Sequence, residues 1–366
     1  MAESAVLVRD AVMIRLERYL LRNLLLGVGT VLLVMSALVI FVNLLSQIED
    51  FDDTRFSALE LLVYVSLRLP AVLFQIVPIA ALIGALLGLG GLAVQRELIA
   101  MQALGLPLWR MIRAAVVGAM VIGAGAWVMG DILGPPAEAM ARQMRDAQRL
   151  GGLGARLIDQ VWLRDGESFV RIDSLVSPRL LRGVEVMTFT ETGQLREIVR
   201  APRAVVEPDG WLLFDADGTR FEADSASVFH HDQVIWPLRI EPHMVEVLAV
   251  RPETLTLVEL WRQMQFLSEN GLETDAFSAL FWSRLILPVS VLPMLLLAVP
   301  LLLGGLRDSS MARRVMIGLV IGAIYYLTTV TMGGGGAVLG LPIAVSAWLP
   351  TILFSLIAVW RLARMR

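Results

Sequence analysis

The chain has 366 residues, a formal net charge of −3 and no cysteine, and 57% of its residues are hydrophobic. Its mean hydropathy of +0.70 is far above that of a soluble domain and favours an integral membrane protein, in which any domain outside the bilayer is held by packing and not by disulfides. All 31 basic residues are arginine; because a P-loop needs a lysine for the nucleotide phosphates, the chain is not its own P-loop ATPase.

Six apolar stretches are long enough to cross the hydrocarbon core of a membrane, which takes about 20 residues. The first three are Leu24–Leu45, Leu69–Val94 and Ala114–Leu133, and the last three are Leu285–Gly304, Val315–Val330 and Ile343–Trp360. Asp131 interrupts the third stretch near its end. In the second stretch, Gly84 and Gly88 form a small-xxx-small pattern that predicts close helix packing.

Charged residues between these stretches orient the chain in the membrane. Arginines gather before the first stretch, between the second and third, between the fourth and fifth, and at the C-terminus. The loop after the first stretch is acidic, with Glu49, Asp50, Asp52 and Asp53. The positive-inside rule then predicts a multi-pass inner-membrane protein with both termini in the cytoplasm. The first stretch is too long for a signal peptide and lacks a cleavage site, so we expect a retained span.

Residues 135–253 change to a period-two pattern with turn signals, which is typical of short β-strands. Asp165-Gly166 and Asp209-Gly210 predict hairpins, and Asp217-Gly218 predicts a further turn. By topology this region lies in the periplasm. The fold class is therefore a membrane α-helical protein with six transmembrane helices and an inserted periplasmic all-β jelly-roll-like domain.

Residues 254–282 predict a helix at the periplasmic membrane surface, because Thr256 and Glu259 form a capping box before an apolar face. The expected organisation is spans one to three in residues 1–134, the β-domain in 135–253, the interfacial helix in 254–282, and spans four to six in 283–366.

The loop between spans two and three predicts a short amphipathic helix over residues 96–104, ended by Gly105 and Pro107. Glu97 lies in its first turn, and Leu98 and Met101 lie on an adjoining face. The plainer interpretation is an interfacial turn with a capping acid, which periodicity alone favours. The alternative is a coupling helix that docks into a separate ATPase.

Arginines follow span three at helical spacing. Arg142, Arg145 and Arg149 fall on one helix face, and Arg68 lies at the same edge of span two. Arginine at headgroup depth binds phosphate in a bidentate manner, but it also extends from helix ends towards water without any ligand. Both interpretations stay open for these residues.

No catalytic or metal-binding pattern is present. The three histidines, His230, His231 and His243, lack the spacing of a zinc site and are best interpreted as strand residues. There is no nucleophile elbow either. We therefore predict no metal, no catalytic residues and no enzymatic activity.

Three blocks of sequence resemble the LptF/LptG permease family over nearly the whole chain. The first runs from Pro78 into Glu97–Gly105, the second includes Met140–Arg142, Arg145 and Gly151-Gly152, and the third includes Gly305–Arg307, Arg314–Gly318, Gly340–Pro342 and Leu349-Pro350. The third block favours the LptG branch over the paralogous LptF branch.

This resemblance implies a subunit of an ABC transporter that extracts lipopolysaccharide from the inner membrane. The implied partners are an LptF subunit, a dimer of the ATPase LptB, the transmembrane helix of LptC beside span one, and lipopolysaccharide itself; nucleic acid is not a partner. No cofactor is implied for this chain, since ATP is bound by LptB.

The resemblance also implies residue roles. Glu97, with Leu98 and Met101, would couple to the ATPase. Arg68, Arg142 and Arg145 would bind the lipid headgroup, and Phe41 and Ile40 would line the cavity between the permeases. Ile40 and Ser46, together with Ala71, replace basic residues of relatives, so capture of the headgroup rests on the three arginines or on the partner permease.

Four alternatives remain. The chain could be the LptF-type subunit. A lipoprotein-releasing permease would carry its large domain between spans one and two instead of after span three. A membrane scaffold for a periplasmic bridge would need neither Glu97 nor the arginines. A membrane enzyme has the least support, because no catalytic group is found.

Overall fold

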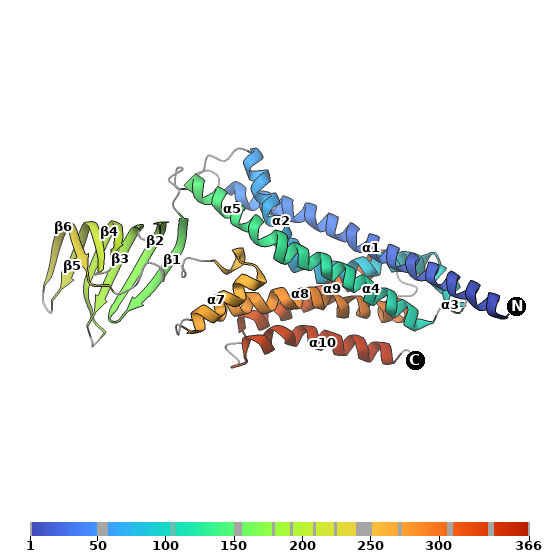
Figure 1. Ribbon diagram of the computed structural model, residues 1–366. Helices are drawn as coiled ribbons and strands as arrows, with labels where there is room; N and C mark the ends of the chain where they lie inside the picture. The colour runs from blue at the N-terminus through green and yellow to red at the C-terminus, as the bar shows by residue number, and fades with distance from the viewer. Residues whose placement is uncertain are drawn as a thin grey trace. The chain divides into compact units, whose positions relative to one another are not determined.

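The computed structural model describes the backbone of residues 2–49, 58–103, 105, 107–149, 156–177, 180–190, 193–207, 210–222, 225–238, 251–269, 273–305, 310–335 and 340–364. The chain forms two compact units. A helical unit holds the first helix with Ala58–Glu138 and Pro252–Arg366, and a strand unit is built from Ala139–Arg251. Figure 1 shows the long helices of the first unit running alongside one another.

The spans are formed by α1 (Ala2–Glu49), α2 (Ala58–Val94), α4 (Leu108–Trp127), α8 (Asp275–Pro300), α9 (Met311–Gly335) and α10 (Ile343–Ala363). The shorter elements are α3 (Glu97–Ala103), α5 (Gly134–Arg149), α7 (Leu257–Glu269), the 3-10 turn η2 (Pro252–Thr254) and the π-helical turns η1 (Val128–Leu133) and η3 (Leu301–Gly305). Within the described residues, six helices are long and apolar enough to cross a membrane, which confirms the six spans.

The third span extends beyond the predicted stretch, because α4 continues through η1 into α5 instead of ending at two prolines. Pro135 and Pro136 have no N–H and cannot donate to the carbonyls of Asp131 and Ile132 four residues earlier. The helix accommodates them by a π turn, in which the N–H of Gly134 donates to Met129 five residues back.

The core of the helical unit lies along α2 and α8, which are the most buried spans. Leu82 and Leu86 of α2 are fully buried in the same cluster as Val291 and Met294 of α8. In contrast, α1, α9 and α10 expose large apolar side chains, among them Leu33, Phe41, Leu327 and Leu356. Apolar surfaces of this kind are suited to lipid or to partner helices.

Helices α1 and α2 cross in backbone contact at three glycines. A methyl group added at Gly27 would lie 2.2 Å from the carbonyl oxygen of Gly84, and one added at Gly88 would lie 2.2 Å from that of Asn23. No real methyl group approaches an oxygen so closely, so the two helices can cross here only because glycine has no side chain. The close packing predicted from Gly84 and Gly88 is confirmed, with Gly27 as their partner.

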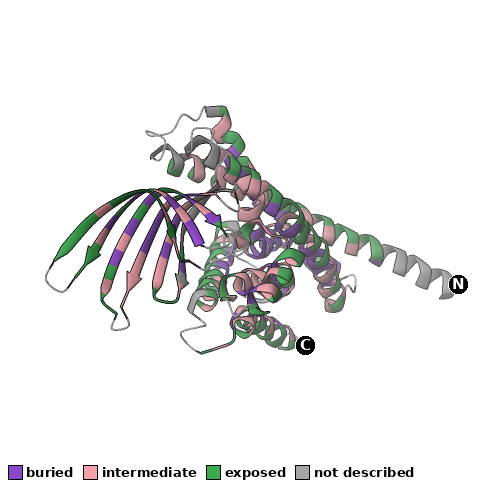
Figure 2. Cartoon of the chain, turned by 60° about the vertical axis from the view of Figure 1, so that its left-hand side comes forward, coloured by how far each residue is buried: buried purple, intermediate pink, exposed green. Residues whose placement is uncertain are grey.

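The strand unit is an antiparallel meander in which neighbours along the chain are neighbours in the sheet. Its strands are β1 (Arg156–Asp165), β2 (Ser168–Ser177), β3 (Leu180–Phe189), β4 (Leu195–Glu207), β5 (Gly210–Phe221) and β6 (Ala226–Trp236). Buried residues concentrate along the inner strands, while β6 is mostly exposed (Figure 2).

The expected fold class, a helical membrane protein with an inserted β-domain, is confirmed. The described strands, however, form one sheet without the two-sheet crossovers that define a jelly roll. Two turn predictions are confirmed, since hairpins join β1 to β2 after Asp165 and β4 to β5 before Gly210. The prediction of a turn at Asp217-Gly218 is wrong, because both residues are paired inside β5.

Gly218 and Asp217 each make contacts across the sheet that explain the residue type at these positions. The Phe229 ring of β6 covers Gly218, where an added methyl group would lie 2.1 Å from the ring. Asp217 belongs to a charged row across five strands, in which each residue pairs with the next: Arg171, Glu185, Arg200, Asp217 and His230. Glu185 is buried and accepts from Arg200 Nε at 2.7 Å, and Arg171 Nη1 lies 3.2 Å from its other oxygen.

We expect Gly27→Ala and Gly88→Ala to destabilise the helical unit by about 1–3 kcal/mol each, because the added methyl groups overpack the crossing of α1 and α2. Gly29→Ala and Gly91→Ala are matched controls on the same helices, since nothing lies within 4 Å of an added methyl group there. The apparent Tm of the purified chain checks this. Equal effects in all four variants would contradict the close crossing.

We expect Asp217→Asn to lower the pKa of His230. The Asp217 carboxylate accepts from His230 Nδ1 at 2.9 Å and raises the pKa of the imidazole above 6.5. This contribution to stability is complete below the unfolded pKa and is lost as the pH rises through the raised folded pKa. Histidine-labelled NMR titration of the full chain checks the shift, with Asp215→Asn on the same strand as control; an unchanged His230 pKa would contradict it.

Candidate functional site

The short helix α3 follows directly on α2 and is set by two residues with positive φ. Arg96 has φ +61° between α2 and α3, and Gly105 has φ +86° shortly after α3 ends. Glycine adopts this conformation without a steric cost, so Gly105 is suited to stop a helix. The chain then resumes as α4 at Leu108.

Leu98 and Met101 anchor α3 to the helical unit. Both are buried, with 2% and 5% of their surfaces exposed, and both belong to the core cluster that α2, α4 and α8 share. The expectation that these two side chains contact an ATPase is therefore revised, because their surfaces are already covered by the chain itself. They instead join α3 rigidly to the spans.

Glu97 is held on the first turn of α3 by α1. The hydroxyl of Tyr19 donates to Glu97 Oε2 at 2.9 Å, and Glu97 remains partly exposed. A carboxylate with one fixed partner and a free edge can still accept from a donor of another protein. The acidic residue expected to couple to a partner is thus preorganised and accessible.

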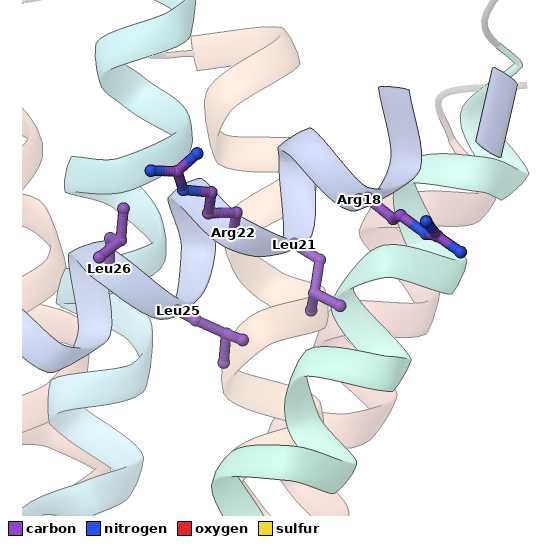
Figure 3. A pocket seen from close by; sticks show the side chains of 5 residues that line it. All are labelled: Arg18, Leu21, Arg22, Leu25 and Leu26. Atoms are coloured by element: carbon purple, nitrogen blue, oxygen red, sulfur yellow. The ribbon is translucent and has the colours of Figure 1, made fainter. Parts of the chain in front are cut away.

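A shallow groove of about 390 Å3 lies on α1 near Tyr19, lined by Arg18, Leu21, Arg22, Leu25 and Leu26. Figure 3 shows Leu21 and Leu25 on one side of α1 and Arg22 on the other. Next to Arg18 of this groove, Glu17 pairs with Arg110 of α4 at 3.3 Å. This end of α1 is therefore tied to both α3 and α4.

The structure places the three predicted headgroup residues in different units. Arg68 of α2 lies 3.5 Å from Glu138 of α5 through its Nε, and its guanidinium lies 5.9 Å from the Tyr64 ring centre. Arg142 and Arg145 are half-buried and follow Glu138 on α5. A joint cluster of the three arginines remains a prediction.

The two predicted cavity residues lie on α1. Phe41 is 59% exposed and Ile40 is half-buried. Phe41 therefore offers an apolar surface that the described residues leave uncovered, as a wall of a shared cavity would require. Their role in lining such a cavity remains a prediction.

Sequence reasoning assigned no role to the buried charges Asp131, Arg284 and Arg314, although Asp131 interrupts the third apolar stretch. Asp131 in η1, Arg284 in α8 and Arg314 in α9 are 8%, 6% and 0% exposed. Arg314 donates to the carbonyl of Gly90 in α2. Their signal was an ionisable residue in an apolar window, which is costly in a membrane and is usually partnered.

Comparison with known proteins gives a match along almost the whole chain. Residues 18–364 match the family model described as lipopolysaccharide export system permease LptF/LptG. The chain is 26% identical to the lipopolysaccharide export system permease protein LptG of Haemophilus influenzae, over 96% of this chain and 99% of that protein. It is 27% identical to the protein of the same name from Escherichia coli K12, over 95% and 98%.

We expect Tyr19→Phe to loosen α3, because the hydroxyl that fixes Glu97 is lost. Because one fixed contact of the helix is lost, amide exchange within Glu97–Ala103 should speed up several-fold. Hydrogen–deuterium exchange with mass spectrometry measures this. Tyr326→Phe, an exposed tyrosine on α9, is the control. Unchanged exchange in α3 would show that Leu98 and Met101 alone hold the helix.

Proposed function

Because the chain belongs to the LptF/LptG family of lipopolysaccharide export permeases, we propose that it is the LptG-type subunit of an ABC transporter that extracts lipopolysaccharide from the inner membrane. The observation that carries this is a full-length similarity to two LptG proteins, together with an accessible acid on a helix fixed to the spans. The partners would be an LptF-type permease, two LptB subunits and the transmembrane helix of LptC.

External work is required by the energetics of the substrate. Lifting a lipid out of a bilayer exposes acyl chains at about 0.8 kcal/mol per CH2 group, and lipopolysaccharide has several such chains. This chain has no lysine for a P-loop, so the work comes from a partner that hydrolyses ATP. The protein's own part is to carry motion from that partner to the lipid.

The α3 helix is suited to receive this motion. Glu97 would accept a hydrogen bond from the ATPase, and Leu98 and Met101 would pass a displacement of α3 to α2, α4 and α8, with which they share a core. Because packed cores deform little, α3 and these spans would move together. In this proposal α3 and both termini lie in the cytoplasm, and the strand unit lies in the periplasm.

Apolar and basic side chains would then handle the lipid. Phe41 would face the cavity between the two permeases and shelter acyl chains from water. Arg68, Arg142 and Arg145 would bind the phosphates of the headgroup in a bidentate manner. Arg68 would do so while it is also paired with Glu138.

Photocrosslinking tests this function directly. A photoreactive residue at position 41, 142 or 145, in proteoliposomes with the full complex, should form ATP-dependent adducts with lipopolysaccharide. The same residue at position 356, an exposed site on α10, should form adducts with phospholipid only. ATP hydrolysis without lipopolysaccharide adducts at any of the three positions would favour a scaffold that does not transport.

Complementation distinguishes the two branches of the family. The chain should restore growth of cells depleted of their LptG protein, provided that it assembles with the resident partners, and should not restore cells depleted of LptF. The opposite result would assign it to the LptF type.

We expect Glu97→Gln to weaken association with the ATPase on the order of tenfold, because a charge-assisted hydrogen bond contributes about 1.5–3 kcal/mol. Lipopolysaccharide release should fall in parallel, and the apparent Tm should stay close to that of the native chain. Glu269→Gln, an exposed acid on α7, is the control. Normal association and release in Glu97→Gln would contradict the coupling role.

A further inference from the structure

Two buried opposite charges meet at the start of α7. Asp131 comes from the π turn η1 of the third span, and Arg284 comes from α8, the fourth span. Arg284 Nη1 lies 3.9 Å from Asp131 Oδ1. In a membrane protein such a pair is costly to bury and is retained where it holds something in place.

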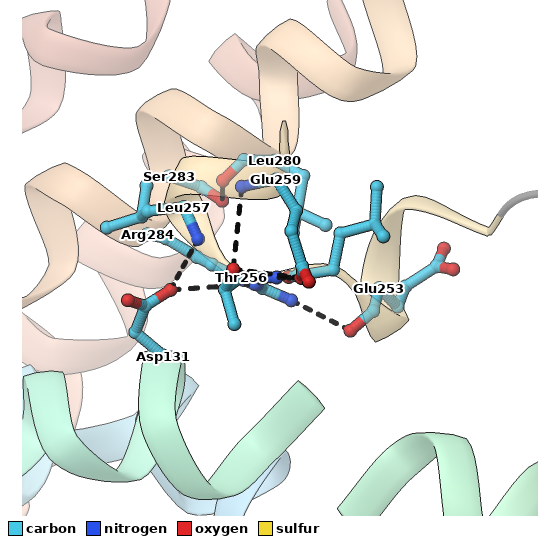
Figure 4. A network of polar contacts seen from close by, with 9 residues as sticks. Asp131, Glu253, Thr256, Leu257, Glu259, Leu280, Ser283 and Arg284 are labelled. Atoms are coloured by element: carbon cyan, nitrogen blue, oxygen red, sulfur yellow. Dashed lines mark hydrogen bonds and ion pairs between the residues drawn. The ribbon is translucent and has the colours of Figure 1, made fainter. Parts of the chain in front are cut away.

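The pair binds the backbone at the first residue of α7 and in the turn just before it. Asp131 Oδ1 accepts from the N–H of Leu257 at 2.6 Å, although the two residues are 126 positions apart. Arg284 Nη2 donates to the carbonyl of Glu253 at 2.8 Å, and its Nη1 donates to the carbonyl of Leu255. Figure 4 shows Arg284 lying between Asp131 and the turn that carries these carbonyls.

The start of α7 has its own cap as well. The carboxylate of Glu259 accepts from the backbone N–H of Thr256 at 2.8 Å and from its hydroxyl at 2.9 Å, which confirms the predicted capping box. A local cap would be enough to start a helix. The Asp131–Arg284 pair is therefore not needed to form α7, and its distinct effect is to fix where α7 begins relative to two spans.

This position matters because the segment Ala139–Arg251, which carries the strands, starts soon after η1 and ends just before η2. The outgoing chain leaves the helical unit after Glu138, on the helix that continues from η1, and the returning chain re-enters at Pro252, within η2. Asp131 precedes the point where the chain leaves the helical unit. The carbonyls of Glu253 and Leu255, which Arg284 binds, follow the point where it returns.

We propose that Asp131 and Arg284 are positioning residues that fasten the two ends of the segment Ala139–Arg251, its tethers, to the third and fourth spans. A displacement of these spans then moves the two tethers together. The part of this inference that concerns transport rests on the proposed function. There, the displacement of the spans is the motion that delivers lipid to the strand unit.

The first experiment measures position without any transport. The chain has no cysteine, so spin labels on Gln265→Cys of α7 and Ser66→Cys of α2, both exposed positions, have no background in it. Pulsed electron paramagnetic resonance on the full chain in nanodiscs should give one narrow distance. Asp131→Asn keeps an oxygen acceptor but loses the charge, and Arg284→Lys keeps the charge but loses the two-pronged guanidinium. Each variant should broaden the distance distribution.

Arg262→Gln and Asp275→Asn are matched controls, since both remove an exposed charge nearby and should leave the narrow distance intact. A single cooperative unfolding transition in each of the four variants would establish that they are folded. An unchanged distance in both Asp131→Asn and Arg284→Lys would overturn the proposal, whatever the transport activity.

The second experiment uses the reconstituted complex. Asp131→Asn and Arg284→Lys should retain ATP hydrolysis and ATPase association but release several-fold less lipopolysaccharide to an acceptor. Loss of hydrolysis as well would overturn the positioning role. Absence of lipopolysaccharide release in the native complex, with the distance result intact, would instead contradict the proposed function alone.

Discussion

Inside a membrane a polar group must find its partner within the protein, and this constraint decides where the helical unit is rigid. Arg284 is bound by Asp131 and by two carbonyls, and Arg314 by the carbonyl of Gly90. The hydroxyls of Tyr325 and Thr351 lie 3.1 Å apart between α9 and α10. Each contact joins different helices or turns, so that these polar groups are satisfied within the protein. Apolar packing fills the space between these points.

The same unit is fixed at two places along one continuous helix. The segment α4–η1 begins close after α3, which is anchored by Leu98 and Met101, and carries Asp131 near its other end. A helix transmits displacement along its axis better than a loop does, because its backbone hydrogen bonds resist compression. In these proposals, α3 receives the motion of the ATPase and Asp131 helps to hold the strand unit. The helix formed by α4 and η1 therefore links the two as a single stiff element.

Much of this arrangement could be predicted from local sequence, and the exceptions have a shared cause. The spans, the capping box at Thr256 and the hairpin at Asp165-Gly166 depend on neighbours in the chain. Asp217-Gly218 has the same local signal as a hairpin, but strand pairing with β4 and β6 overrides it. Arg284 looked like a residue before the fourth span, yet its long-range partners allow the helix to begin at Asp275. The burial of Leu98 and Met101 likewise depends on helices that periodicity does not identify.

The π turn in the third span has a consequence for helical phase. A π turn accommodates one residue more than an α turn, so η1 stores an extra residue in the middle of a long helix. Loss of that residue would restore α-helical winding and rotate everything after it by about 100° around the helix axis. Arg142 and Arg145 would then point in another direction, although their sequence spacing would be unchanged. The length of this segment therefore sets the orientation of the arginine face as firmly as the arginines themselves do.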